Sequence, residues 1–330
     1  MTYRMPAEWA LHDWLWIGFP GAPAEWPEGL AKAQAQVVAF ARAVHADGRG
    51  EAVRLVTRTE ADAATARSLL GADTGVSVIV EPFGDIWLRD TGPIGIASGR
   101  DRALAGFGFN GWGGKFDMPG DQDIGARLAA GTGLPFYQHP WVCEGGALDT
   151  DGTGLFVTTE QCLLNANRNP SLDRRQILTL LTGGLGLSDM LWLGDGLVND
   201  HTDGHVDNLA RFVAPGVLAV PKATTTDDPN DLIYANAAAR ALAHGLEVVR
   251  LPSAGRYLIE GEVAPASYMN FLIANATVVV PQYNAPNDSA AVEALAALFP
   301  DRDVIGVPSF ALLRGGGSFH CCSQQMPSAG

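Results

Sequence analysis

The chain has 330 residues, and its 22 Lys and Arg against 36 Asp and Glu give a formal net charge of −14. Nucleic-acid binding needs clustered basic residues, so this balance excludes a nucleic-acid partner and suits a small cationic ligand. Because no apolar stretch of about 18 residues occurs and no charged lead precedes an apolar run at the start, we expect neither membrane insertion nor export.

Apolar periodicity predicts an α/β chain in which short strands alternate with helices. No low-complexity linker interrupts the pattern, so we expect one domain over 1–330. About five strand–helix units can be counted, and a doubly wound open sheet is the default architecture for such a pattern. In chain order the pattern predicts a helix over 30–45, a strand over 53–57, a helix capped by Thr59, a strand over 76–80, a helix over 121–130, a strand over 155–158, a helix over 173–185, strands over 191–193 and 217–220, a helix over 229–244 with Pro229 in its first turn, strands over 246–250 and 277–280, a helix over 289–299 and a strand over 304–307.

The first polar cluster is Asp85-Ile86-Trp87-Leu88-Arg89-Asp90-Thr91-Gly92-Pro93. The alternation of side chains predicts a short strand with one polar edge before a Gly-Pro turn. Arg89 and Asp90 then form either a surface ion pair or part of a pocket, and Trp87 is either core or a pocket wall.

The second cluster, His201-Thr202-Asp203-Gly204-His205-Val206-Asp207-Asn208, places an imidazole and a carboxylate two residues apart. On a strand or an extended loop both side chains point the same way, so His205 and Asp207 can share one pocket. With a thiol they suffice for nucleophilic catalysis. There are two alternatives. One is a metal site made of His201, His205 and Asp207, and the other is a histidine with a purely structural role.

The third cluster supplies the thiol, because Gly315-Gly316-Gly317 leads directly into Ser318-Phe319-His320-Cys321-Cys322. Successive glycines can take φ > 0 and allow close approach of a ligand, which makes Cys321 a candidate nucleophile. The alternative is a buried cysteine beside a flexible tail. We expect His320 and Cys322 to be inert packing residues, and Cys143 and Cys162 to act as small hydrophobic residues. Four cysteines without a C-x-x-C pair indicate a reducing location, which we take to be the cytoplasm.

These clusters resemble the agmatine deiminases, in the guanidine-modifying superfamily that includes the bacterial peptidylarginine deiminases. The resemblance spans nearly the whole chain in order, and it is also carried by Met5-Pro6-Ala7-Glu8-Trp9, Glu144-Gly145-Gly146, Thr158-Thr159-Glu160-Gln161-Cys162-Leu163-Leu164-Asn165 and Asn167-Arg168-Asn169-Pro170. It implies a five-bladed α/β propeller with pseudo-fivefold symmetry and a site on its central axis. It also implies a hydrolase of linear amidines that converts agmatine to N-carbamoylputrescine and ammonia, as in putrescine and polyamine synthesis. Because Cys321, His205 and two carboxylates are sufficient for this chemistry, we expect no cofactor and no metal.

The resemblance implies a catalytic set of Asp90, His205, Asp207 and Cys321. A guanidinium is a planar cation with forked N–H donors, so carboxylates such as Asp90 and Asp207 suit it. Glu144 resembles a carboxylate that orients the histidine. The remaining expected substrate contacts are Trp87, His201, Gly316 and Gly317. The sequence does not decide whether the chain forms a homo-oligomer.

His201 departs from the family pattern, which has an acidic residue before Thr202 to attract the ammonium of agmatine. Arginine, peptidylarginine or a guanidino acid therefore remain alternative substrates. Two alternatives come from other functional classes. One is a metal-dependent hydrolase that uses His201, His205 and Asp207, and the other is a catalytically silent protein that binds guanidino ligands.

Overall fold

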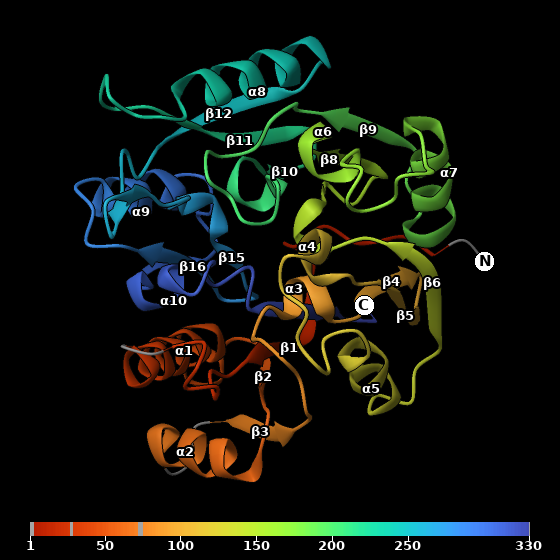
Figure 1. The fold of residues 1–330 in the computed structure, drawn as a ribbon, viewed down its shortest axis with the longest axis vertical. Coiled ribbons are helices and arrows are strands. Elements are labelled where there is room, and N and C mark those ends of the chain that lie inside the picture. The colour runs from red at the N-terminus through yellow and green to blue at the C-terminus, as the bar shows by residue number, and fades with distance from the viewer. Residues whose placement is uncertain (1–2, 27–28, 72–74, 330) are drawn as a thin grey trace.

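The strands form separate small sheets, so the expectation of one doubly wound open sheet is wrong. The computed structural model describes residues 3–26, 29–71 and 75–329, and within them there are five sheets of three or four strands and one two-stranded hairpin. The single domain expected over 1–330 also includes residues outside these described ranges. Figure 1 shows the five larger sheets around the middle of the molecule, with α2, α5, α7, α8 and α9 toward its rim.

The five larger sheets share one strand pattern. In each, an antiparallel pair is followed by a parallel pair. Parallel neighbours need a long crossover, and a helix supplies it between each parallel pair. The strands are β1 His12–Gly18, β2 Ala52–Thr57, β3 Val76–Val80, β4 Ile94–Ser98, β5 Asp101–Gly108, β6 Phe136–Val142, β7 Asp149–Thr150, β8 Leu155–Thr158, β9 Asp189–Trp192, β10 Arg211–Ala214, β11 Val217–Lys222, β12 Glu247–Pro252, β13 Leu258–Ile259, β14 Glu262–Val263, β15 Leu272–Ile273, β16 Thr277–Gln282, β17 Asp303–Pro308 and β18 Ser323–Pro327.

The helices confirm most of the predicted segments. The helix predicted over 30–45 has those bounds, and the Thr59 side chain accepts a hydrogen bond from the Asp62 amide as the predicted cap. Pro229 lies outside α8, because Asn230 is the residue that precedes the first turn. The α-helices are α1 Leu30–His45, α2 Glu60–Leu70, α3 Leu88–Thr91, α4 Gly111–Gly114, α5 Ile124–Ala130, α6 Glu160–Leu163, α7 Arg174–Leu185, α8 Asp231–Ala243, α9 Asp288–Ala296 and α10 Phe310–Arg314, and the 3-10 helices are η1 Ala46–Gly48, η2 Gly145–Ala147, η3 Val206–Asn208 and η4 Tyr268–Asn270. In the described part of the chain, no helix combines the length and apolar character needed to cross a bilayer.

Two of the polar clusters have a different local structure from the predicted one. The segment around Asp90 forms the helical turn α3 rather than a strand, and Asp207 lies in η3 with His205 immediately before it. Alternation over five or six residues does not distinguish a strand from a turn whose side chains are held by distant partners.

The two ends of the described chain lie in one sheet. β18 pairs antiparallel with β1, and Leu15 lies opposite Gln325. This pairing joins the segment that carries Cys321 to the first sheet. A stack of Phe40 in α1 on Phe319, with ring centroids 4.5 Å apart, fixes the same segment from the side of the helix.

We expect Phe40→Ala to lower the free energy of unfolding by about 3–5 kcal/mol, because both rings of the stack are fully buried and the truncation leaves a cavity. Urea unfolding followed by fluorescence measures this loss. Leu232→Ala, at an exposed position of α8, is the control and should change the free energy by less than about 0.5 kcal/mol. Equal losses for the two variants would contradict the role of the stack.

Candidate active site

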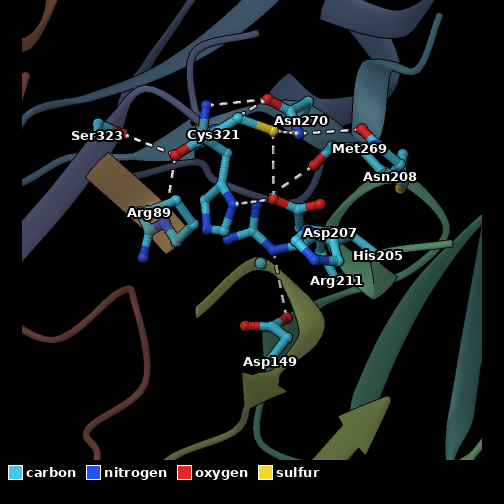
Figure 2. Close-up of polar contacts among 12 residues, drawn as sticks. Arg89, Asp149, His205, Asp207, Asn208, Arg211, Met269, Asn270, Cys321 and Ser323 are labelled. Carbon is cyan, nitrogen blue, oxygen red and sulfur yellow. Dashed lines mark hydrogen bonds and ion pairs between the residues drawn. The ribbon is translucent and has the colours of Figure 1, made fainter. Parts of the chain in front are cut away.

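The Cys321 thiol is held by hydrogen bonds from two sides, as Figure 2 shows. Asn270 Nδ2 lies 3.0 Å from Sγ, and the Asn270 Oδ1 accepts the Cys321 amide at 3.2 Å. On the other side the thiol donates to Asp207 Oδ2 across 3.6 Å. Asn270 in η4 therefore fixes both the backbone and the sulfur of the candidate nucleophile.

The three glycines of the segment before Cys321 are required for different structural reasons. Only Gly316 takes the predicted positive φ, of +113°. A Cβ on Gly315 would come within 2.3 Å of the Trp26 ring. A Cβ on Gly317 would lie 2.7 Å from the Trp87 ring and 3.0 Å from the Cys321 Cβ. Gly315 and Gly317 are thus required by close packing against indole rings, and Gly316 by its backbone conformation.

Asp90 is buried at the end of α3, where the residues around it fix both of its oxygens. Oδ1 accepts the Gly146 amide at 2.9 Å and Oδ2 accepts Trp112 Nε1 at 3.0 Å. His205 Nδ1 lies 3.6 Å from Oδ1. Arg89 forms no surface ion pair, because its side chain is buried and donates to the carbonyl of His320 and to Gln324 and Gln325.

His205 and Asp207 are fully buried, and each has polar atoms without a hydrogen-bond partner among the described residues. These atoms are Nδ1 and Nε2 of His205 and Oδ1 of Asp207. Buried polar atoms in folded proteins are almost always satisfied, so such a group of exceptions needs an explanation. A ligand with several N–H donors can satisfy the carboxylate oxygen.

Glu144 lies beside His205 and is paired with a buried cation. Its Oε1 accepts Arg168 Nε at 2.6 Å, and Oε2 has no hydrogen-bond partner among the described residues. Ligand atoms of Glu144, Cys162 and His205 lie within 4.8 Å of one another, and this is the only such group of three found in the described part of the chain. The structure therefore does not bring together the predicted metal set of His201, His205 and Asp207.

A pocket leads to the Cys321 thiol from the surface. The predicted contacts Trp87, His201 and Gly316 line it, whereas Gly317 lies behind the Trp87 ring and is not among the lining residues. The described residues that line the pocket are Glu25, Asp85, Trp87, Asp90, Trp112, Phe116, Met118, His201, Thr202, Gly315, Gly316 and Cys321. Acidic and aromatic side chains predominate, which suits a planar cation.

The charges around the pocket change the pKa of each central group. Burial, with Asp207 and Asp90, raises the pKa of the Cys321 thiol well above its usual value. Burial lowers the pKa of His205, but Asp90, Glu144 and Asp207 outweigh it, so the net shift is upward and favours the imidazolium. Burial raises the pKa of Asp207, but the hydrogen bond and charge of His320 outweigh it and the net shift is downward. These shifts favour a neutral thiol beside an ionised Asp207 carboxylate.

Several residues at the site have no predicted role. His320 is not inert, since Nδ1 lies 2.7 Å from Asp207 Oδ2 and Nε2 lies 2.9 Å from Glu8 Oε2. Asn270, Arg89 and Arg211 likewise hold the central segments. Glu8, Arg89 and His320 occur in motifs that carry the family resemblance, and Arg89 was considered as part of a pocket, whereas Asn270 and Arg211 had no signal in the sequence. Cys322, Cys143 and Cys162 are buried, and burial raises the pKa of all three thiols.

A buried thiol and imidazole flanked by carboxylates, in a mixed α/β fold with several small sheets, are typical of guanidine-modifying enzymes. Residues 4–327 match the family model of the Porphyromonas-type peptidyl-arginine deiminases, and the chain belongs to this family. It is 37% identical to the agmatine deiminase of Pseudomonas fluorescens, with 99% of this chain and 96% of that protein covered. It is 36% identical to the agmatine deiminase of Stutzerimonas stutzeri at the same coverage.

Solved structures give the same result for the fold. The agmatine deiminase of Enterococcus faecalis matches with a TM-score of 0.90 at 30% identity, over 100% of this chain and 97% of that one. A Cys-to-Ser variant of the C. jejuni agmatine deiminase with bound substrate matches with a TM-score of 0.92 at 27% identity, over 99% of this chain and 97% of that one. The mixed α/β fold of this chain is therefore that of the agmatine deiminases.

We expect iodoacetamide to alkylate Cys321 slowly at pH 7 and roughly tenfold faster for each pH unit up to about pH 9, because the raised pKa keeps the thiol protonated. Peptide mass spectrometry identifies the labelled residue. Cys321 is the only cysteine that lines the pocket in the described part of the chain, so Cys143, Cys162 and Cys322 serve as internal controls. A rate that is already constant at pH 7 would show that the thiolate is stabilised in the free protein.

Proposed function

We propose that this chain is an agmatine deiminase, which hydrolyses the guanidinium group of agmatine to N-carbamoylputrescine and ammonia. The observation that carries the proposal is the Cys321 thiol between two buried carboxylates and beside an unpartnered imidazole. Relatives and solved structures that carry this activity in their names match the full chain. Another small guanidino compound is the alternative substrate.

In the proposed first half-reaction, the guanidinium enters the pocket and its N–H groups donate to Asp90 and Asp207. The cation offsets the two carboxylate charges that disfavour the thiolate, so the thiol loses its proton to solvent. Cys321 Sγ then forms a bond to the guanidinium carbon. The His205 imidazolium donates a proton to the departing nitrogen, the C–N bond breaks, and ammonia leaves.

In the second half-reaction, the covalent thiouronium is attacked by water. His205, now neutral, accepts a proton from this water as its oxygen bonds to the carbon. The C–S bond then breaks as the new hydroxyl group loses its proton to solvent and becomes the ureido carbonyl, and the product separates from the Cys321 thiolate. Glu144 raises the pKa of His205 from beside the imidazole, and Arg168 fixes the position of Glu144.

We also propose that the five larger sheets are the blades of a single five-bladed α/β propeller over residues 1–330. The common strand pattern of the sheets supports this arrangement. So does the β18–β1 pair, because a ring of blades needs its first blade to be completed by the last strand. The catalytic residues would then lie on the central axis.

The part of the pocket that would receive the substrate tail differs from the family pattern, because His201 lines the pocket where an acidic residue is expected. Its ring stacks on Phe116 with centroids 6.2 Å apart. Glu25 also lines the pocket and can attract a cationic tail. Asp85 lines it too, but burial raises its pKa to about 7 and its oxygens accept the Ile86 amide and Trp87 Nε1. The Glu25 carboxylate is the reason to keep agmatine as the first substrate.

We expect Cys321→Ser to lower the rate of ammonia release from agmatine by about 10³-fold or more, because an alcohol ionises far less readily than a thiol. Cys322→Ser should change the rate little, since its sulfur contacts the Phe319 carbonyl and not the pocket. Coupled measurement of ammonia tests both variants. If Cys322→Ser were inactive and Cys321→Ser active, the nucleophile would be Cys322 and not Cys321.

We expect His201→Glu to raise kcat/KM for agmatine about tenfold and to depress it for 4-guanidinobutyrate, because one charge contact of roughly 1–3 kcal/mol changes affinity by about tenfold to a hundredfold. His139→Glu makes the same substitution in β6 and does not alter the pocket lining, so it is the control. Equal effects of His201→Glu on both compounds would show that residue 201 does not contact the tail.

A further inference from the structure

His320, the residue before the candidate nucleophile, is clamped between two buried carboxylates. Its Nδ1 lies 2.7 Å from Asp207 Oδ2, and its Nε2 lies 2.9 Å from Glu8 Oε2. The ring is 2% exposed, so water does not compete for these contacts. The mechanism proposed above gives this residue no role.

The clamp has a consequence for the proton count. An ionised carboxylate only accepts hydrogen bonds, and a neutral imidazole has a single N–H donor. Two short contacts from one ring to two carboxylates therefore require a proton on each ring nitrogen. His320 is then an imidazolium, and its positive charge is next to both Asp207 and the backbone of Cys321.

The same charge balance involves every segment packed around the ring. Glu8 pairs with Arg211 at 2.8 Å and lies 3.7 Å from Arg89, and Arg211 also contacts Asp149 at 3.3 Å. The charged groups that face His320 and the thiol are Glu8 of the N-terminal segment, Arg89 and Asp90 of α3, Asp149 of β7, Asp207 of η3 and Arg211 of β10. Without the imidazolium, Asp207 would lose the cation that contacts it directly.

The contact also determines which Asp207 oxygen is free. Oδ2 accepts His320 and lies 3.6 Å from the Cys321 sulfur, whereas Oδ1 has no hydrogen-bond partner among the described residues. A carboxylate that is held by one oxygen cannot rotate freely about its terminal torsion. Oδ1 is thereby kept available for a donor from the substrate.

We propose that His320 is a positioning residue, which as an imidazolium anchored on Glu8 holds Asp207 Oδ2 beside the Cys321 thiol and leaves Oδ1 free for the guanidinium. The inference rests on the proposed function for the identity of the substrate. The predicted effect of His320 on the Cys321 thiol is independent of the proposed function.

Two amide variants separate the two contacts of the ring. In His320→Asn the amide nitrogen replaces Nδ1 and can still donate to Asp207, whereas in His320→Gln it replaces Nε2 and reaches only Glu8. His12 is the matched control, because it is another buried histidine, with Nδ1 2.9 Å from Glu51 Oε1, and it does not line the catalytic pocket. Its Asn and Gln variants should lower the melting temperature and leave kcat unchanged.

The first measurement is the pH profile of Cys321 alkylation by iodoacetamide, which needs no turnover. Both His320 variants lose the positive charge, so the profile should move up by about one pH unit, with alkylation about tenfold slower at pH 8. The second is kcat with agmatine, which should fall about 100-fold or more in His320→Gln and within about tenfold in His320→Asn, because only the former releases Asp207.

An unchanged alkylation profile in folded His320 variants overturns the proposal, as does a loss of kcat in His320→Asn as large as that in His320→Gln. Thermal melts and circular dichroism establish that the variants are folded, and if His320→Gln does not fold, the alkylation profile of His320→Asn decides. A wild-type protein that releases no ammonia from any guanidino compound contradicts the proposed function instead. In that case the alkylation profiles still test the role of His320.

Discussion

The interaction on which the centre of the molecule depends is the buried carboxylate of Glu8. Its Oε2 contacts Arg211 and His320, and its Oε1 accepts the Ile273 amide. One side chain from the N-terminal segment thus joins β10, β15 and the segment that precedes β18. Burial disfavours its charge, but Arg211, His320 and Arg89 hold the pKa of Glu8 well below its usual value. Buried ion pairs add little net stability, since desolvation cancels most of the attraction, yet removing one partner is costly. The network is therefore better understood as fixing positions than as strengthening the fold.

The positions that it fixes are those of the candidate site. Asp207 is held by His320, and the Cys321 backbone carbonyl accepts the amide of Arg89. Among the described residues of this centre, the atoms without a hydrogen-bond partner are both nitrogens of His205, single oxygens of Asp207 and Glu144, and Nη2 of Arg89 and of Arg211, which lie 3.7 Å and 2.8 Å from Glu8 Oε2. Burying a polar atom without a hydrogen bond costs free energy, so such atoms persist only where another interaction offsets the loss of hydration. The unpartnered Asp207 oxygen belongs to the carboxylate that contacts the Cys321 thiol, so a guanidinium, which is rich in N–H donors, is a chemically suitable partner for it.

The sequence alone was sufficient for the elements whose stability is local. The apolar stripe of 30–45 and the cap at Thr59 depend on neighbours three and four residues away, and both predictions are confirmed. It was not sufficient for α3, η3 or His320, because their conformations depend on partners more than a hundred residues away, such as Gln324 for Arg89 and Asp207 for His320. The family resemblance supplied the candidate residues Asp90, His205, Asp207 and Cys321, and the structure brings all four together. Neither the resemblance nor the periodicity indicated that the arginines and Glu8 hold them in place.

The acidic character of the site links its reactivity to the charge of the ligand. Burial, with Asp207 and Asp90, raises the pKa of the Cys321 thiol well above its usual value and so disfavours the thiolate. A bound cation reverses this balance, since the carboxylates then stabilise the ligand instead of opposing the thiolate. Hydrolysis converts the cationic guanidinium to a neutral ureido group, which can no longer form charge-assisted hydrogen bonds with the two carboxylates. The product therefore binds more weakly than the substrate, and its departure restores the protonated thiol. In the proposed mechanism, the same two charges would select the substrate, activate the nucleophile and favour release of the product.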